Sequence, residues 1–259
     1  SYYMSESKFT VPTEMVDLPS KGLLYPKDSP LSAGQIEIKY MTAREEDILT
    51  NANLLRQGLA IEKMLKSIIK TPIDYEDLIL GDRNAILIAA RILAYGKDYA
   101  FNYFNPSTME SEVVNGDLQS VKYKTVNTAL FNEKNEFSFE LPFTKNTITF
   151  KALTVAEDRK IDEEMKGMKK NLGEAAPGLL TTKLKHQITS VNGDYSTKTV
   201  RDFIDSGALL SKDSLPLRKY IESIIPDIDT QITFTTKGGE EVTTDMPMTA
   251  EFFFPGSGI

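Results

Sequence analysis

The chain has 259 residues, of which 41% are hydrophobic and 26% charged, so it can bury a sizeable core, and this composition argues against wholesale disorder. Lys and Arg number 30 against 37 Asp and Glu, and the net charge of −7, without a run of basic residues, argues against direct binding of nucleic acid. The absence of cysteine excludes disulfides, a thiol nucleophile and a thiolate metal site.

The N-terminal segment, SYYMSESKF, is polar where a secretory signal would be apolar. The longest apolar run, at residues 85–95, is interrupted by Arg91 and is too short to span a bilayer. We therefore expect a protein without a membrane anchor that is made in a cytoplasm. Residues 1–17 show no sustained hydrophobic period and predict an extended arm. Its composition fits a segment that becomes ordered on binding, and free termini are also commonly just loose.

A turn and a strand are predicted after the arm. The stretch LPSKG at residues 18–22 predicts a turn, because proline presets one backbone angle and glycine accepts a positive one. Residues 34–42 then place Ile36, Ile38 and Tyr40 on one face and polar residues on the other. This alternation is typical of a half-buried strand.

A helical unit is predicted up to residue 96. Thr42 and Glu45 have the spacing of a capping box, and the acids at residues 45–47 stand where the helix dipole favours negative charge. These acids thus have a structural explanation. Apolar stripes predict further helices over 59–70 and 82–95, with Gly96 as the stop of the latter and a short helical turn between the two.

Residues 97–153 predict a small antiparallel sheet. Four short segments in this range are rich in aromatic and β-branched residues and are separated by Asn, Pro, Gly and Asp. They are DYAFNYF, SVKYKTV, EFSFELPF and TITFKAL.

The C-terminal part predicts helices followed by a hairpin. Thr154 and Glu157 form a second capping-box match, which opens a helix to about residue 170. Two strands flank the turn KGG, whose Gly238-Gly239 pair suits a hairpin. Three shorter helices are expected before them, near residues 179–188, 198–206 and 213–225.

Together these elements predict an α+β fold with an N-terminal helical unit, a small antiparallel β insertion, and C-terminal mixed helices with a β-hairpin. We divide the chain into an extended N-terminal arm, a strand plus helical unit, a small antiparallel β region, and a helical C-terminal region that ends in short strands. The corresponding residues are 1–17, 18–96, 97–153 and 154–259.

The sequence offers little for catalysis. His186 is the single histidine, and its polar neighbours are typical of an ordinary, partly exposed residue. The chain lacks the G-x-S-x-G pattern of a nucleophile elbow and the glycine-rich patterns of phosphate loops. We therefore predict no enzymatic activity, no cofactor and no metal site. A hydrolase that uses His186 with a nearby carboxylate is the enzyme alternative.

The C-terminal TAEFFFPGSGI carries three consecutive phenylalanines, Phe252, Phe253 and Phe254. Successive residues of a strand point to opposite faces, so a strand could bury all three only if both faces were covered. They either close a core or anchor a partner protein, because aromatic residues are enriched at binding hot spots.

Five segments of the chain resemble, in order, the baseplate hub subunit family of T4-type contractile-tailed bacteriophages. The resemblance extends from about Leu18 to Pro255, and each motif alone is only moderately specific. The segments are LPSKGLLYP, MTAREEDIL, GDRNAILIAARILAYG, FELPFTKNTITFKALTVAED and MTAEFFFP.

This resemblance implies a structural component of the baseplate hub that acts through protein contacts in tail assembly. Its expected partners are other hub or wedge proteins in an oligomeric assembly, and its expected location is the virion tail, after synthesis in the host cytoplasm. A non-virion assembly factor is the alternative. We place the interface hypothesis on the first and last motifs, at Leu18, Pro19, Lys21, Gly22, Tyr25, Phe252, Phe253 and Phe254.

Many members of the family carry a Cys-x-x-Cys pair in the β segment after the third helix, where a small metal-binding ribbon could form. The comparable region here reads FNYFNPSTMESEVV and has no cysteine. Metal binding is therefore not expected, and a sheet in this region would be held by packing and strand pairing alone.

Overall fold

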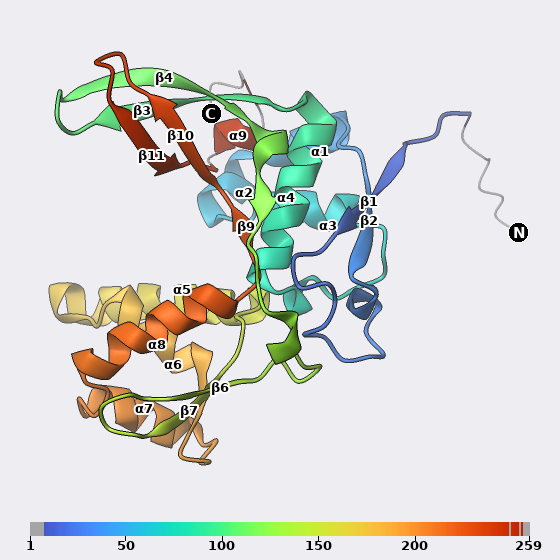
Figure 1. The fold of residues 1–259 in the computed structure, drawn as a ribbon. Coiled ribbons are helices and arrows are strands. Elements are labelled where there is room, and N and C mark those ends of the chain that lie inside the picture. The colour runs from blue at the N-terminus through green and yellow to red at the C-terminus, as the bar shows by residue number, and fades with distance from the viewer. Residues whose placement is uncertain (1–7, 249, 254, 256–259) are drawn as a thin grey trace, which may run out of the picture.

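A computed structural model describes residues 8–248, 250–253 and 255, and shows two lobes (Figure 1). The upper lobe in this view contains the N-terminal helices together with the last strands of the chain, and the lower lobe contains α5 to α8 with β6 and β7. The chain passes to the lower lobe before β6 and returns along β9, so residues far apart in sequence build the upper lobe together (Figure 1).

The helices of the upper lobe follow the predicted order. The capping box of Thr42 and Glu45 is confirmed at the start of α1, and α4 ends at Gly96 as predicted. A separate short helix, α2, was not predicted, and Asn51 caps it by accepting a hydrogen bond from Leu54 N at 3.0 Å. The helices are α1 (Ala43–Leu49), α2 (Ala52–Gln57), α3 (Ala60–Ile68) and α4 (Leu80–Tyr95), with the predicted short turn at Tyr75–Asp77 between the last two.

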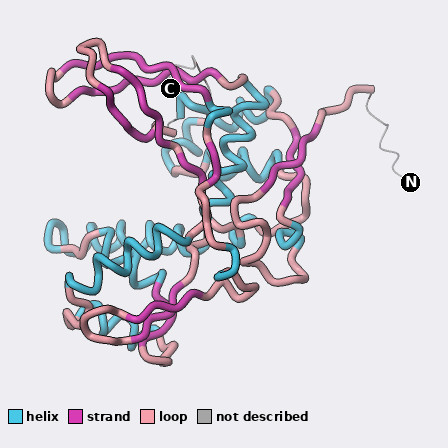
Figure 2. Tube along the Cα trace, viewed as in Figure 1, coloured by secondary structure: helices cyan, strands magenta, loops and turns pink. Residues whose placement is uncertain are grey.

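Paired strands in the upper lobe form two-stranded antiparallel sheets (Figure 2). The end of the segment predicted as an arm is strand β1, which pairs with β2. The hairpin around KGG is confirmed as β10 and β11. The pairs are β1 (Thr13–Asp17) with β2 (Gln35–Lys39), β3 (Asp98–Asn105) with β4 (Glu110–Asp117), β5 (Lys122–Tyr123) with β9 (Ile228–Asp229), and β10 (Gln231–Thr235) with β11 (Glu241–Asp245).

The lower lobe packs helices against a three-stranded antiparallel sheet of order β6-β7-β8 (Figure 2). The capping box of Thr154 and Glu157 is confirmed at the start of α5. The strands are β6 (Phe137–Glu140), β7 (Thr147–Phe150) and β8 (Ile188–Val191), and the helices are α5 (Val155–Leu172), α6 (Leu179–Gln187), α7 (Thr197–Asp205) and α8 (Ser211–Ile224).

The α+β class is confirmed, but the expectation of a single sheet within 97–153 was wrong. The strands of that range belong to three different sheets, because β5 pairs with β9 and β7 pairs with β8, both of which come later in the chain. Pairing between segments so far apart leaves no mark on local hydrophobic patterns. The segment FNYFNPSTMESEVV, compared above with a metal-binding ribbon, lies in the β3–β4 hairpin. Pairing of its two strands holds this hairpin, which contains no cysteine.

No helix within the described ranges is long and apolar enough to cross a membrane. Over the same residues, no cluster of three or more histidine, aspartate or glutamate side chains has an arrangement that could hold a metal ion.

Candidate functional site

The first predicted turn is tied to α4 by the buried carboxylate of Asp82. Its Oδ1 accepts a hydrogen bond from Ser20 N at 2.9 Å, and its Oδ2 accepts from Ser20 Oγ and Tyr25 Oη, each at 2.6 Å. Tyr25 Oη in turn accepts from Ile79 N at 2.9 Å, just before α4 begins. Asp82 is fully buried, so these bonds hold the LPSKGLLYP motif against the GDRNAIL motif inside the core.

Burial is the largest cause of the pKa shifts in this network. Burial raises the pKa of Asp82 above its ordinary value, whereas the hydrogen bonds from Ser20 and Tyr25 act in the opposite direction. The pKa of Tyr25 is also raised, first by burial and then by the charge of Asp82. Both shifts follow from the enclosure of the network, which lies in the core and holds the fold together there.

Two close backbone approaches fix the same region. Gly22 has a φ of +76°, and a Cβ at this position would lie 2.5 Å from the carbonyl oxygen of Ser32. A Cβ at Gly81 would lie 2.0 Å from the carbonyl oxygen of Pro226, where the chain returns from the lower lobe. Glycine is therefore required at both positions, since no side chain fits between these backbones.

The far end of α4 is tied to the C-terminal motif by Arg91. This side chain is 2% exposed and donates hydrogen bonds to the carbonyl oxygens of Phe252, Gly96 and Asp98. The Phe252 ring packs edge-on against Tyr99 at a centroid distance of 4.9 Å. The buried guanidinium thus joins the C-terminal motif to the backbone that follows α4.

The fourth motif joins the N-terminal end of α4 through the backbone. Leu80 N donates to the carbonyl oxygen of Leu153 at 3.0 Å, and Val155 N donates to that of Leu78 at 2.8 Å. The second motif also reaches α4, because Tyr95 Oη donates to Glu46 Oε2 at 2.9 Å. All five motifs that carry the family resemblance therefore meet around α4, which consists almost entirely of the third of them.

Most of the eight residues predicted to form an interface are buried in the core of the chain. Of the eight, Lys21 is exposed, Phe254 lies outside the described residues, and Pro19 and Gly22 are buried. A partner that contacted the buried residues would have to displace part of the core, so for them the structure favours the core alternative. Leu18, Tyr25, Phe252 and Phe253 are all at most 4% exposed.

A second buried carboxylate, Asp213 at the start of α8, holds a turn of the lower lobe. Its Oδ1 accepts from Phe143 N at 2.7 Å, and its Oδ2 accepts from Thr144 N at 3.2 Å and from Thr144 Oγ1 at 2.7 Å. Burial acts to raise the pKa of Asp213, but the hydrogen bonds from Thr144 and Phe143 hold it below its ordinary value. The turn belongs to the fourth motif, FELPFTKN.

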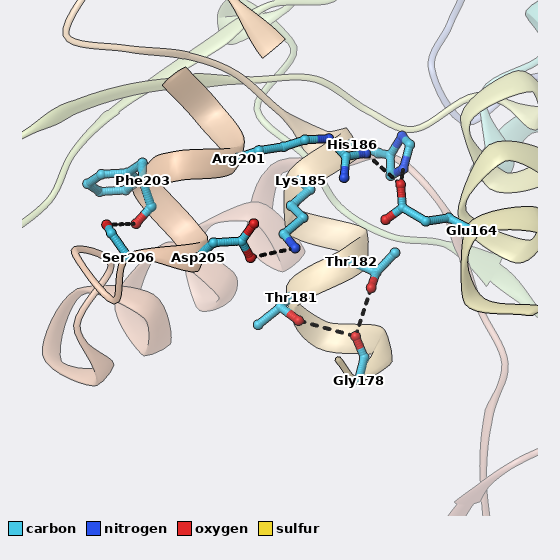
Figure 3. Close-up of polar contacts among 10 residues, drawn as sticks. All are labelled: Glu164, Gly178, Thr181, Thr182, Lys185, His186, Arg201, Phe203, Asp205 and Ser206. Carbon is cyan, nitrogen blue, oxygen red and sulfur yellow. Dashed lines mark hydrogen bonds and ion pairs between the residues drawn. The ribbon is translucent and has the colours of Figure 1, made fainter. Parts of the chain in front are cut away.

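The single histidine lies in a polar cluster between α5, α6 and α7 (Figure 3). His186 Nε2 is 3.3 Å from Glu164 Oε1, the oxygen that also accepts from Arg201 Nη2 at 2.5 Å. Burial acts to raise the pKa of Glu164, but the hydrogen bond and charge of Arg201 hold it below its ordinary value. Nearby, Lys185 Nζ lies 2.6 Å from Asp205 Oδ1.

This cluster brings His186 next to a carboxylate, which is the pair that the enzyme alternative requires. However, the Glu164 oxygen that faces His186 is already engaged by Arg201. The three side chains come from three different helices and join them, which is a structural role.

Two cavities lie beside the residues that connect the motifs to α4. A cavity of about 1160 Å³ is lined by Tyr25 and by several acids, and among them Asp77 has a raised pKa because of burial and of the neighbouring charges of Asp74 and Glu76. A cavity of about 660 Å³ lies where the two lobes face each other and contains the ion pair of Arg159 with Glu62. Much of its lining is apolar and includes Leu59, Ile61, Leu87, Ile161, Met165, Leu179, Met248 and Phe253.

Sequence reasoning missed both buried aspartates and Arg91. An aspartate in the first turn of a helix is usually explained by the helix dipole, and Asp82 and Asp213 both occupy such a position. A signal exists for Asp82 alone, since it lies in one motif and bonds the Ser-containing turn of another.

A family model described as T4 bacteriophage base plate protein matches residues 13–254, which is nearly the whole chain. The comparisons with curated proteins and with solved structures gave no match.

Proposed function

Because the chain belongs to the family of T4 bacteriophage base plate proteins, we propose that it is a structural component of the baseplate hub that works through protein contacts and without catalysis. A phage baseplate protein resides in the virion tail and contacts other baseplate proteins. The finer assignment, to the hub and to a structural role, rests on the order of the motifs within the chain.

The observation that carries the proposal is where the family motifs lie. They meet at α4 through Asp82, Arg91, Tyr95 and the backbone bonds of Leu80 and Val155, and the first two of these side chains are buried in the core. In an enzyme family the shared residues would be expected to surround a reactive pocket. Here they hold the fold, as expected for a protein selected to keep its shape in an assembly.

The test is to interrupt the gene and supply the chain from a plasmid, and then to measure the chain in purified particles and in extracts of infected cells. A structural component should be present in particles at a fixed copy number, and particles should not form without it. Presence in extracts together with absence from particles would overturn the structural assignment.

The alternative is an assembly factor that leaves before the virion is complete. The cavity between the lobes favours this role, because its apolar lining would suit an apolar segment of a folding partner. A dye that fluoresces on apolar surfaces should then bind to the isolated chain, and Met165→Glu should abolish that signal. The matched control is Met109→Glu on the β3–β4 turn, where the side chain is 73% exposed.

A further inference from the structure

The β6–β7 turn presents one large apolar side chain to solvent. Phe143 is 58% exposed, although it stands between the fully buried Leu141 and the buried strand residue Ile148. Leu210 and Leu215, at the start of the adjacent helix α8, are also exposed, by 39% and 45%. Exposing a phenylalanine forgoes the free energy that its burial would provide.

The backbone under this ring is held by more bonds than a surface turn needs. Besides the three bonds to Asp213, Leu141 N donates to the carbonyl oxygen of Asn146 at 2.8 Å, and Lys145 N donates to that of Leu141 at 3.0 Å. Asn146 Nδ2 donates to Thr144 Oγ1, and Asn192 Nδ2 from the next hairpin donates to Asn146 Oδ1.

The same turn contains a residue in an unfavourable conformation. Lys145 has a φ of +66°, a region that side chains other than glycine and asparagine rarely adopt. Such a conformation persists where the surroundings fix it, and here the bond from Lys145 N to the carbonyl oxygen of Leu141 does so, together with the bonds of Asp213 to the two preceding residues. The result is a rigid support for a side chain that contributes little to the core.

A rigid exposed aromatic is the preferred kind of binding anchor. Few rotamers are lost when it is buried by a partner, so more of the contact energy appears as affinity. The exposed charged side chains beside the ring are two lysines: Lys212 Nζ lies 4.8 Å from the ring centroid, and Lys145 lies two residues after Phe143, whereas the carboxylate of Asp213 is buried beneath the turn. The complementary surface is therefore an apolar pocket with an acidic rim.

We propose that the turn of residues 141–146 is a docking site whose anchor, Phe143, inserts into an apolar pocket bordered by acidic side chains on a neighbouring baseplate protein. This proposal rests on the proposed function and names one surface through which it is carried out. The partner's acids would face Lys145 and Lys212.

The test uses the full-length chain and baseplate assemblies purified from cells infected with phage that lacks this gene. The concentration of added chain that half-saturates these assemblies is measured for the native chain and for Phe143→Ala. We expect the variant to require about 30-fold more chain, which corresponds to the loss of a hot-spot residue. Its melting temperature should stay close to that of the native chain, because the ring is mostly exposed.

The control is Phe104→Ala, which removes a ring of similar exposure, 52%, from the β3–β4 hairpin of the other lobe. This variant should bind within about twofold of the native chain. If the native chain binds and Phe143→Ala binds equally well, the docking site is overturned while the proposed function stands. If the native chain itself does not bind, the proposed function fails.

The acidic rim is tested separately with Lys212. Lys212→Glu should weaken binding more than Lys212→Ala, and added salt should reduce the difference because it screens exposed charges. Equal or tighter binding of Lys212→Glu would overturn the acidic rim.

Discussion

Asp82 in the upper lobe and Asp213 in the lower lobe each hold a turn in place, but one turn is buried and the other exposes an aromatic side chain. Each is a fully buried carboxylate in the first turn of a helix, and each accepts hydrogen bonds from the backbone and a hydroxyl group of a turn more than 50 residues earlier in the chain. The turn held by Asp82 is itself buried with Tyr25, whereas the turn held by Asp213 leaves Phe143 exposed. The LPSKGLLYP motif thus contributes Tyr25 to the core, whereas the FELPFTKN turn exposes Phe143 to solvent.

The pKa values of the two aspartates are shifted in opposite directions. Asp82 receives one backbone bond and two hydroxyl bonds in a fully enclosed site, and burial raises its pKa. Asp213 receives two backbone bonds and one hydroxyl bond near the cation of Lys145, and these outweigh burial, so its pKa is lowered. Since both carboxylates are buried and each accepts three bonds, we infer that their neighbours separate the two sites: Lys145 favours the charged form of Asp213, whereas Asp227 disfavours that of Asp82.

The largest expected effect is that of Asp82→Ala. Removing the carboxylate leaves Ser20 and Tyr25 with buried hydroxyl groups that have lost their acceptor. We expect the free energy of unfolding to fall by about 4 kcal/mol, measured by urea denaturation. A loss below about 1 kcal/mol would contradict the role of Asp82 as the link between the first motif and α4.

Gly81→Ala tests the backbone contact beside Asp82. The added Cβ would lie 2.0 Å from the carbonyl oxygen of Pro226, so one of the two backbones must move. We expect a loss of about 3 kcal/mol in unfolding free energy. The matched control is Gly167→Ala in the middle of α5, where a Cβ meets open space, and this variant should be more stable by up to about 1 kcal/mol.

Asp213→Ala should have a smaller effect than Asp82→Ala. Its donors belong to a turn that is partly open to water, which can replace the lost acceptor. We expect a loss of about 2 kcal/mol in the same denaturation measurement. If this variant lost as much as Asp82→Ala, the contrast between an enclosed and a surface turn would be wrong.

The smallest effects are those of pH. The lowered pKa of Asp213 adds stability that is present above the unfolded pKa, near 3.9, and is lost as pH falls through the folded value. The raised pKa of Asp82 adds stability that is present below the unfolded pKa and is lost as pH rises through the folded value.

The corresponding measurement is the difference in unfolding free energy between the native chain and each Asp→Asn variant from pH 7 to pH 3. This difference should grow with acidification for Asp82→Asn and shrink for Asp213→Asn, on the order of 1 kcal/mol for each unit of pKa difference. Slopes of the same sign would refute the contrast between the two sites.

Local signals in the sequence were enough to find the long helices. The capping boxes at Thr42 and Thr154 and the stop at Gly96 are short-range patterns, and the structure confirms all three. The sheets could not be assigned in this way, since β5 pairs with β9 about a hundred residues later. Strand pairing over such a distance depends on the packing of the whole chain.

The candidate sites were harder to predict than the helices. The burial of Tyr25 and Phe252 depends on Asp82 and Arg91, which the sequence places more than 50 residues from either. Conversely, Phe143 has the apolar neighbours of a core residue in FELPFTKN, yet it is exposed in a turn whose backbone bonds to Asp213, 70 residues later. The exposure of such a side chain cannot be predicted from the pattern of hydrophobic residues in the sequence.

The most direct test is the structure of the native baseplate by cryo-electron microscopy. We expect density for this chain with the turn of residues 141–146 buried against a neighbouring protein, and with Asp82, Ser20 and Tyr25 enclosed within the chain. A baseplate that contains the chain with Phe143 facing solvent and the Asp82 turn opened onto a partner would contradict this expectation.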